Sequence, residues 1–244
     1  MKAINIMLVV VAVALTMALS GSCAFALAFT VPYVTSAPTI DGTLAAGEWT
    51  GTANIVTMTR RDGGGTHPST LYFQHDGTSL YIGVDSGWGS GWDVLWKVFI
   101  DGDYSRTFSG SATAPHIDIS CDYPSPGGWG GYNSYWYHSA ANPDGVPISN
   151  PPGAARASAG SSNVSYEFKI PLADLGAVPG DSVGFYTWHG YDGQESHTYE
   201  FPGVYVNQPD QWATLNLVPE PGTVALIAPA LLGLAGIAAA RRRK

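Results

Sequence analysis

The feature that most constrains this 244-residue chain is its series of short apolar stretches separated by turn signals, with no long helical period between the two ends. Asp-Gly pairs mark many of the turns, beginning at Asp41, Asp62, Asp76, Asp101, Asp144 and Asp192. Both residue types tolerate positive φ, which tight turns between strands require. We therefore predict strands at 29–34, 54–60, 70–75, 80–85, 94–101, 132–138, 164–170, 183–189, 199–206 and 212–217.

The predicted strands differ in how they are buried. Residues 163–170 alternate strictly between polar and apolar side chains, which predicts one buried face. Residues 94–100 are apolar on both faces, so this strand is expected to lie centrally. Residues 71–75 and 80–84 flank a turn at 76–79 and predict a hairpin. The predicted fold class is all-β, a single antiparallel β-sandwich of jelly-roll type.

Both ends of the chain have the pattern of targeting segments. Residues 1–26 combine Lys2, an apolar core and small residues, which predicts a secretory signal helix, with an uncleaved anchor as the alternative. Residues 223–240 form an uncharged apolar run of roughly 27 Å as a helix, enough to cross a bilayer. The predicted organisation is a signal peptide at 1–26, a sandwich domain at 27–217 and a sorting or anchor segment at 218–244 with a transmembrane helix.

The tail has three parts in a fixed order. Pro219, Glu220 and Pro221 come first, the apolar run follows, and Arg241, Arg242, Arg243 and Lys244 close the chain. A simple C-terminal anchor is one explanation. The ordered set resembles the PEP-CTERM sorting signal of Gram-negative bacteria. This resemblance implies export across the inner membrane, transient anchoring through the helix, an exosortase-type processing enzyme as partner, and a final place at the cell surface or in the extracellular matrix.

The charge of the central region excludes one class of partner. Without the two ends, 6 basic residues stand against 18 acidic ones, a net charge of −12. This excludes nucleic acid, which needs a basic face, and is compatible with divalent cations or with solubility. Cys23 falls in the signal, so Cys121 has no partner for an intramolecular disulfide. We expect a buried thiol there, with an intermolecular bridge as the alternative.

A second resemblance covers most of residues 38–192. It is carried by Pro-Thr-Ile-Asp-Gly at 38–42, Glu-Trp at 48–49, His-Asp-Gly-Thr-Ser-Leu-Tyr-Ile-Gly-Val at 75–84, Val-Phe-Ile-Asp-Gly-Asp at 98–103, Tyr-Glu-Phe-Lys-Ile-Pro-Leu at 166–172 and Gly-Asp-Ser-Val-Gly-Phe at 180–185. The order resembles family 9 carbohydrate-binding modules and related DOMON-like sandwiches. It implies a sandwich that binds sugars, often with structural calcium. Glu167 matches a recurrent Glu of the family, but its place on a polar strand face predicts a solvated charge or a cross-strand pair. Trp49 is expected in the core.

Aromatic residues predict where a sugar would bind. The chain has 8 Trp and 13 Tyr, and flat rings pack against the C–H faces of sugars. Trp88 and Trp92 lie in one Gly-rich stretch, and Trp129 and Trp136 in another. We predict a sugar site on Trp88, Trp92 and Trp129, with Trp136 as a weaker member. The alternative is ordinary packing on strands, which we assign to Trp96 and Trp188.

A calcium site is the predicted cofactor site. Asp101 and Asp103 straddle Gly102 at the end of an apolar strand, and carboxylates on a tight turn suit Ca²⁺. Ordinary turn chemistry is the alternative, in which case there is no cofactor.

Catalytic patterns are poor. The Gly-x-Ser-x-Gly at 180–184 places Ser182 before a predicted strand, whereas a nucleophile elbow needs a helix there. The 6 histidines are scattered without metal-ligand spacing. We predict no enzyme, but a secreted, surface-sorted module that binds carbohydrate or associates with the extracellular matrix. A structural envelope or biofilm protein without a small ligand is the alternative, followed by a glycoside hydrolase.

Overall fold

The computed structural model describes residues 27–51, 53–87, 95–102, 104, 116–121, 134–139, 142–148, 154–159, 163–190, 198–203 and 209–221. Between 116 and 159, and at 95, 163, 164 and 209, it describes the backbone alone. The elements are β1 (Ala28–Val31), β2 (Asn54–Arg60), β3 (Thr66–His75), β4 (Ser79–Asp85), β5 (Leu95–Asp101), β6 (His116–Cys121), β7 (Ser134–Ser139), β8 (Asn142–Ile148), β9 (Ala154–Ala159), β10 (Asn163–Pro171), α2 (Leu172–Leu175), β11 (Ser182–Gly190), β12 (Tyr199–Phe201), η2 (Pro209–Gln211) and β13 (Ala213–Leu217).

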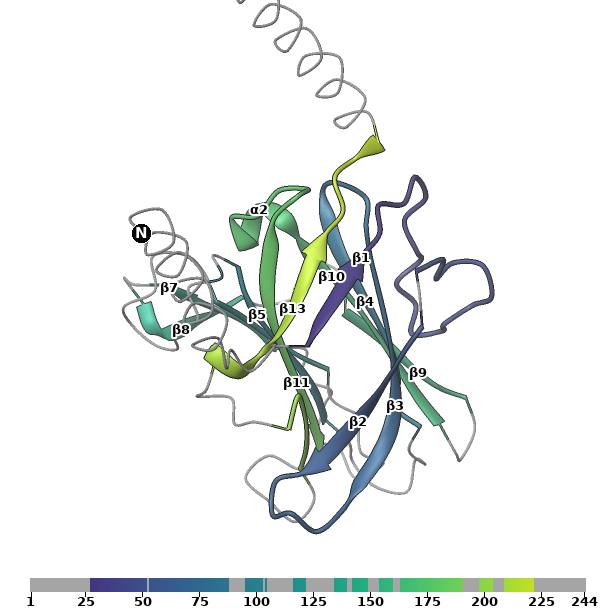
Figure 1. The fold of residues 1–244 in the computed structure, drawn as a ribbon, viewed down its shortest axis with the longest axis vertical. Helices are drawn as coiled ribbons and strands as arrows, with labels where there is room; N and C mark the ends of the chain where they lie inside the picture. The colour runs from purple at the N-terminus through teal and green to yellow at the C-terminus, as the bar shows by residue number, and fades with distance from the viewer. Residues whose placement is uncertain are drawn as a thin grey trace, which may run out of the picture.

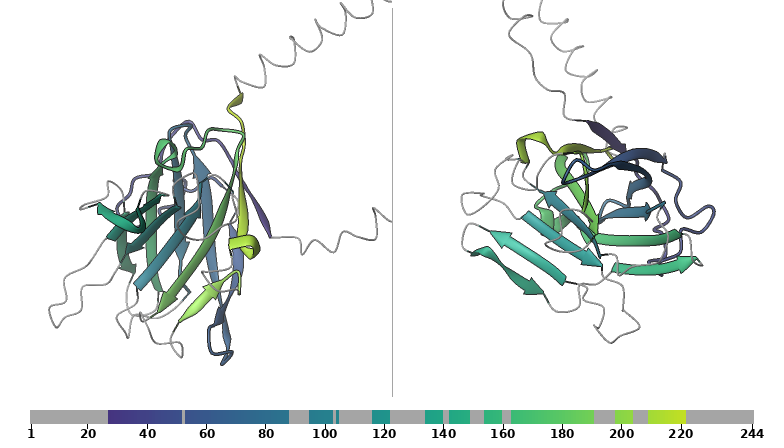
Figure 2. Two further views of the ribbon diagram at one scale, coloured as in Figure 1. Left: turned by 90° about the vertical axis from the view of Figure 1, so that its left-hand side faces the viewer. Right: turned by 90° about the horizontal axis from the view of Figure 1, so that it is seen from below.

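The strands form two layers that face each other (Figures 1 and 2). In the first layer, β8, β7, β6, β5, β11, β13 and β1 are hydrogen-bonded in that order. In the second, the order is β2, β3, β4, β10 and β9. Strand β12 pairs with both β11 and β2 and so joins the layers along one side. The predicted all-β sandwich is confirmed.

One strand pair departs from the predicted antiparallel arrangement. Strand β1 lies parallel to β13, with Ala28 beside Thr214 and Val31 beside Leu217. The two strands lie near opposite ends of the described chain, so no short turn forces them to run in opposite directions. Their parallel course brings the exits of both strands together, and the Val218 N–H donates to the Val31 carbonyl at 3.0 Å.

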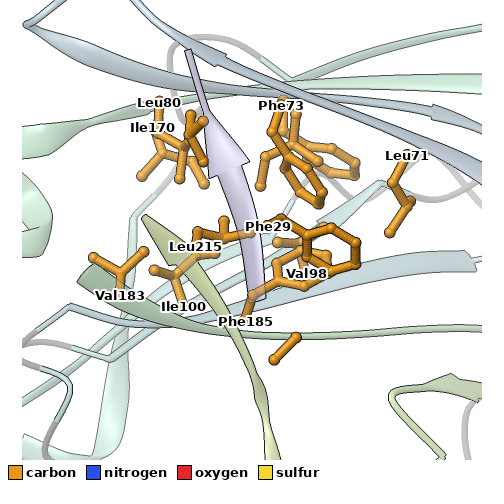
Figure 3. Packing of buried hydrophobic residues seen from close by; sticks show 14 of the residues in the cluster. Phe29, Leu71, Phe73, Leu80, Val98, Ile100, Ile170, Val183, Phe185 and Leu215 are labelled. Atoms are coloured by element: carbon orange, nitrogen blue, oxygen red, sulfur yellow. The ribbon is translucent and has the colours of Figure 1, made fainter. Parts of the chain in front are cut away.

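The core lies between the layers and is built from alternate residues of the strands. Leu71, Phe73, Leu80, Ile82 and Ile170 from the second layer face Val98, Ile100, Val183, Phe185 and Leu215 from the first, as Figure 3 shows for most of them. Phe73 meets Phe185 edge to face across the layers, with ring centroids 5.1 Å apart. The alternation predicted for 163–170 is confirmed on this side, because Tyr166, Phe168 and Ile170 are fully buried.

Several predicted turns and strands are confirmed. Strand β2 has the predicted bounds, and β3 and β4 form the predicted hairpin. Gly42, Gly63 and Gly77 have φ of 87°, 76° and 87°, so the first three Asp-Gly pairs form turns of the expected kind. At the hairpin turn, burial opposes ionisation of Asp76, but hydrogen bonds from Tyr81, Thr78 and Ser79 lower its pKa to about 2.

Three strands were missed, and one predicted turn is wrong. Strands β8 and β9 carry no clear apolar period, whereas β6 alternates Ile117, Ile119 and Cys121 with polar residues and was overlooked. Asp144-Gly145 lies inside β8 rather than in a turn. Strand β8 is an edge of its layer. An edge strand tolerates Pro and Gly because one of its sides needs no ladder hydrogen bonds, so Pro143 and Pro147 do not interrupt it.

The sandwich has two distinct ends. What we call the tail end carries α2, the β3–β4 turn at 76–79 and residues 218–221, which lead into the tail (Figure 1). What we call the loop end carries the β2–β3 turn at 61–65, the exits of β4, β6 and β11 and the starts of β5 and β7. No helix within the described ranges is long and apolar enough to cross a membrane. The predicted signal and transmembrane helices lie outside these ranges.

Candidate functional site

The backbone brings the predicted Trp-bearing segments to the loop end. Trp88 lies three residues after β4 ends at Asp85, and Trp92 lies three residues before β5 begins at Leu95. Trp129 lies in the segment between β6 and β7. The start of β5 pairs with the exits of β11 and β6, and the start of β7 pairs with β6 at Ser120. Both segments are therefore attached to the same end of the first layer.

The side chains of the predicted sugar site are not placed by the structure. Trp88, Trp92 and Trp129 lie outside the described residues, and Trp136 belongs to β7, of which only the backbone is described. The stacking platform stays a prediction. The structure describes only the strand ends to which the segments with these tryptophans attach.

A group of charged and aromatic side chains covers the outer face of the first layer next to this attachment point. We call it the outer patch, and its described members are Arg61, Lys97, Phe99, Tyr186, Trp188, Glu200 and Trp212. Lys97, Trp188 and Glu200 lie side by side on β5, β11 and β12. The Lys97 Nζ lies 5.2 Å from the centroid of the Trp188 ring. The patch therefore places cationic groups and a ring on neighbouring strands.

An ion pair crosses the outer patch beside this lysine. The Arg61 guanidinium donates from Nε to Glu200 Oε1 at 2.6 Å. Burial raises the pKa of the neighbouring Tyr186 hydroxyl, and the negative charge of Glu200 adds to the rise. Tyr186 is thus a neutral phenol at physiological pH. Arg61 and Lys97 are partly exposed, so they can donate hydrogen bonds to hydroxyl groups.

Three of the four rings of the outer patch lie beneath the surface, and Phe99 is partly exposed. Tyr186 and Trp212 are stacked with centroids 5.5 Å apart, and both are fully buried. Trp188 is 5 % exposed and Trp96 is fully buried, which confirms the packing role predicted for these two tryptophans. A sugar that reached this face would meet Arg61, Lys97 and Phe99 first, because these side chains are partly exposed.

The sequence predicted a solvent-exposed Glu167 side chain, and this prediction is wrong. Its carboxylate is fully buried beneath residues 38–49, which fold over the outer face of β10. Oε2 accepts hydrogen bonds from the backbone N–H of Asp41 at 2.9 Å and of Gly42 at 2.6 Å. Oε1 accepts one from the Trp49 indole N–H at 3.0 Å. Burial raises the pKa of Glu167, against the effect of these donors. Its role in the described structure is to fasten a loop.

Trp49 is also not the core residue that was predicted. Its side chain is half-buried on the outer face of the second layer, where it packs against Gly83 of β4. Any side chain at Gly83 would push against the Trp49 ring, with its Cβ 3.0 Å away. The loop of residues 38–49 thus depends on Gly83, which leaves room for the Trp49 ring, and on Glu167, which accepts the loop's hydrogen bonds.

The histidines cluster in a way that their spacing in the sequence does not indicate. His67 of β3 and His189 of β11 contact each other through their Nε2 atoms, 122 residues apart in the chain. Both are buried at the loop end. Sequence reasoning missed this pair because only the fold brings the two strands together.

The predicted calcium site is not supported by the described residues. Asp101 is fully buried and packs against Gly184, while Asp103 lies outside the described ranges. Within those ranges, no three His, Cys, Asp or Glu side chains gather to hold a metal ion. Since Ca²⁺ takes six to eight oxygen ligands, Asp101 alone does not make a site. The calcium site stays a prediction that depends on Asp103.

Comparison with known proteins shows the fold. A family 9 carbohydrate-binding module from Caldicellulosiruptor kristjanssonii in complex with cellotriose superposes with a TM-score of 0.51 at 14 % identity, over 79 % of this chain and 94 % of that one. The same kind of module from that organism in complex with glucose gives 0.49 at 15 % identity, over 79 % and 96 %. The chain has the fold of the cellotriose-bound module. No family model and no curated protein matches the sequence.

Proposed function

We propose that this chain is a non-catalytic carbohydrate-binding module that is exported and sorted to the cell surface or extracellular matrix. One observation carries the proposal: the segments that hold Trp88, Trp92 and Trp129 attach to one end of the sandwich, beside the outer patch. Rings that hold a sugar face and cations that hold its hydroxyls would then lie together. The fold shared with sugar-binding modules supports this assignment.

The sorting part of the proposal rests on the tail. Pro219, Glu220 and Pro221 leave the domain at the tail end, and we propose an exosortase-type enzyme as the partner that recognises them. The signal at 1–26 would direct export, and the apolar run at 223–240 would hold the chain in the membrane until processing.

A glycan array on the purified full-length protein tests the binding proposal, followed by calorimetric titration with cellotriose, glucose and the best glycan on the array. We expect saturable binding to one class of polysaccharide. A protein that is folded by circular dichroism and binds no glycan would contradict the proposal and would favour the structural envelope protein.

A further inference from the structure

Two buried histidines connect the layers at the loop end. The His67 and His189 rings have centroids 4.5 Å apart and meet through Nε2. The side chain of His189 lies between those of Trp96 and Tyr199, which come from the two strands that flank β11. The ring planes are nearly parallel, at 9° to Trp96 and 7° to Tyr199, with centroids 4.8 and 5.3 Å away. This aromatic stack fixes the orientation of His189.

The hydrogen bonds of the pair define where its protons are. His67 Nδ1 lies 3.0 Å from the carbonyl oxygen of Pro68. A carbonyl can only accept, so Nδ1 carries the hydrogen and Nε2 of the neutral ring has the lone pair. The Nε2–H of His189 therefore donates to Nε2 of His67. A proton added to His67 Nε2 would put two N–H groups face to face and a positive charge between buried rings.

The surroundings favour the neutral pair. Among the described residues, the titratable and charged groups that face it are His67 and His189 themselves, the Tyr199 ring against both, Tyr166 behind Trp96, and Arg60 beside Tyr199. Lys97 and Glu200 belong to the opposite face of the first layer. Burial lowers the pKa of His67, and burial together with His67 lowers the pKa of His189.

We propose that the His67–His189 pair is an acid-sensitive clasp, which holds the two layers together at neutral pH and opens when His67 takes up a further proton at Nε2. The segment with Trp88 and Trp92 attaches to the start of β5, which pairs with β11 at Trp96 and His189, so opening would disturb that segment. This last step, and only this step, rests on the proposed carbohydrate binding: glycan affinity would fall on acidification.

The direction of the pH effect follows from proton linkage. An unfolded histidine has a pKa near 6.5, above that of either folded residue. Below about pH 6.5 the unfolded chain binds protons that the folded chain does not, so stability falls as pH falls. For each pH unit of acidification in this range, one such histidine raises the unfolding constant up to about tenfold, and the pair raises it up to about a hundredfold. His75, buried at the tail end with a lowered pKa, adds a similar single-histidine effect.

The first test is nitrogen NMR on the purified full-length protein. At pH 7 we expect a scalar coupling between the two Nε2 atoms across the N–H···N bond, with one nitrogen protonated and the other not. We expect the coupling to disappear on acidification. No coupling at pH 7 would overturn the proposal. So would a loss of stability at pH 7 on treatment with a chelator that removes Zn²⁺ but leaves Ca²⁺ bound, because a metal ion would then join the rings instead of a proton.

The second test compares the pH dependence of unfolding in variants. Below pH 6.5, the unfolding constant of the wild-type protein should rise more steeply on acidification than that of the double variant His67→Phe/His189→Phe, by a factor of up to about a hundred per pH unit. For the control His75→Gln this factor should be at most about ten. A double variant as acid-sensitive as wild type would overturn the clasp. A steep wild-type dependence in a protein that binds no glycan would support the clasp and refute the proposed function. Glycan affinity equal at pH 7 and pH 5 would refute the coupling between them.

Discussion

The indole N–H of Trp49 donates to the carboxylate of Glu167 at 3.0 Å, although the two residues lie 118 positions apart. With the backbone N–H groups of Asp41 and Gly42 on the other carboxylate oxygen, this bond fastens a long loop to the second layer. A buried carboxylate that accepts several N–H hydrogen bonds holds its donors in place. If the carboxylate were lost, all of these donors would lose their acceptor at once.

We predict that Glu167→Gln destabilises the protein by about 1 to 3 kcal/mol, because the amide keeps one acceptor and turns an NH₂ group toward N–H donors. Urea unfolding measures the loss, and faster amide exchange at Asp41 and Gly42 locates it. Lys169→Gln is the matched control, on the same face of β10 but exposed, and should change stability by less than about 0.5 kcal/mol. Equal effects of the two substitutions would show that the loop is held by other contacts.

A second prediction concerns the contact between Gly102 and α2. A Cβ at Gly102 would clash with the backbone carbonyl of Leu175, its carbon lying 2.9 Å away. Since backbone cannot move aside as a side chain does, Gly102→Ala should cost about 1 to 3 kcal/mol. In Gly64→Ala the new Cβ meets only the flexible Arg60 side chain, so a cost below about 1 kcal/mol is expected in the same thermal melt. Similar melting temperatures would contradict the clash.

The tryptophans at the loop end should separate binding from stability. Trp88→Ala, Trp92→Ala and Trp129→Ala should each weaken binding by about 1 to 3 kcal/mol with little change in melting. Trp96→Ala removes a buried ring and should instead cost about 3 to 5 kcal/mol of stability. Calorimetry with the glycan found on the array, together with melting, measures both. If the three loop variants all unfold, their rings belong to the core; if all bind as wild type, the site lies elsewhere.

Processing of the tail is expected near Pro219, Glu220 and Pro221. His75 Nε2 donates to the Val218 carbonyl at 2.8 Å, so the folded domain extends to the residue before this motif. Mass spectrometry of the protein recovered from the cell surface should show a C-terminus near Pro221. Glu220→Ala should leave more of the chain unprocessed. Intact Arg241, Arg242 and Arg243 on the mature surface protein would argue against sorting by this route.

The calcium prediction has a direct test. If Asp101 and Asp103 hold Ca²⁺, millimolar calcium raises the melting temperature and a chelator lowers it. Asp103→Asn should abolish this response, because it removes a charged ligand from the turn. A melting temperature that neither treatment moves would remove calcium from the description of this protein.

The sequence predicted the parts of the fold that local patterns control. Alternation found the buried face of β10, and Asp76-Gly77 found the β3–β4 hairpin, because both depend on neighbouring residues. Strands β8 and β9 were missed because they lie at the edges of their layers, where pairing on one side suffices and an apolar period is not required.

The candidate site was less predictable for the opposite reason. The polar face that carries Glu167 was expected in solvent, and only a loop more than a hundred residues earlier buries it. His67 and His189 likewise have no shared motif, since their contact depends on two strands from different layers. Glycine-flanked tryptophans can be recognised in a sequence, but the end of the sandwich to which they attach depends on the order of the strands.

The separation of the two ends has a consequence for how the molecule would meet its surroundings. The nine residues of β11 run from the tail end to the loop end and span about 30 Å. If the tail anchors the chain as we propose, the loop end can lie up to about that far from the lipid. Each copy could then bind a polysaccharide chain before its tail is processed. Processing would release a protein that is already bound to polysaccharide, so it would not have to find its ligand in the matrix.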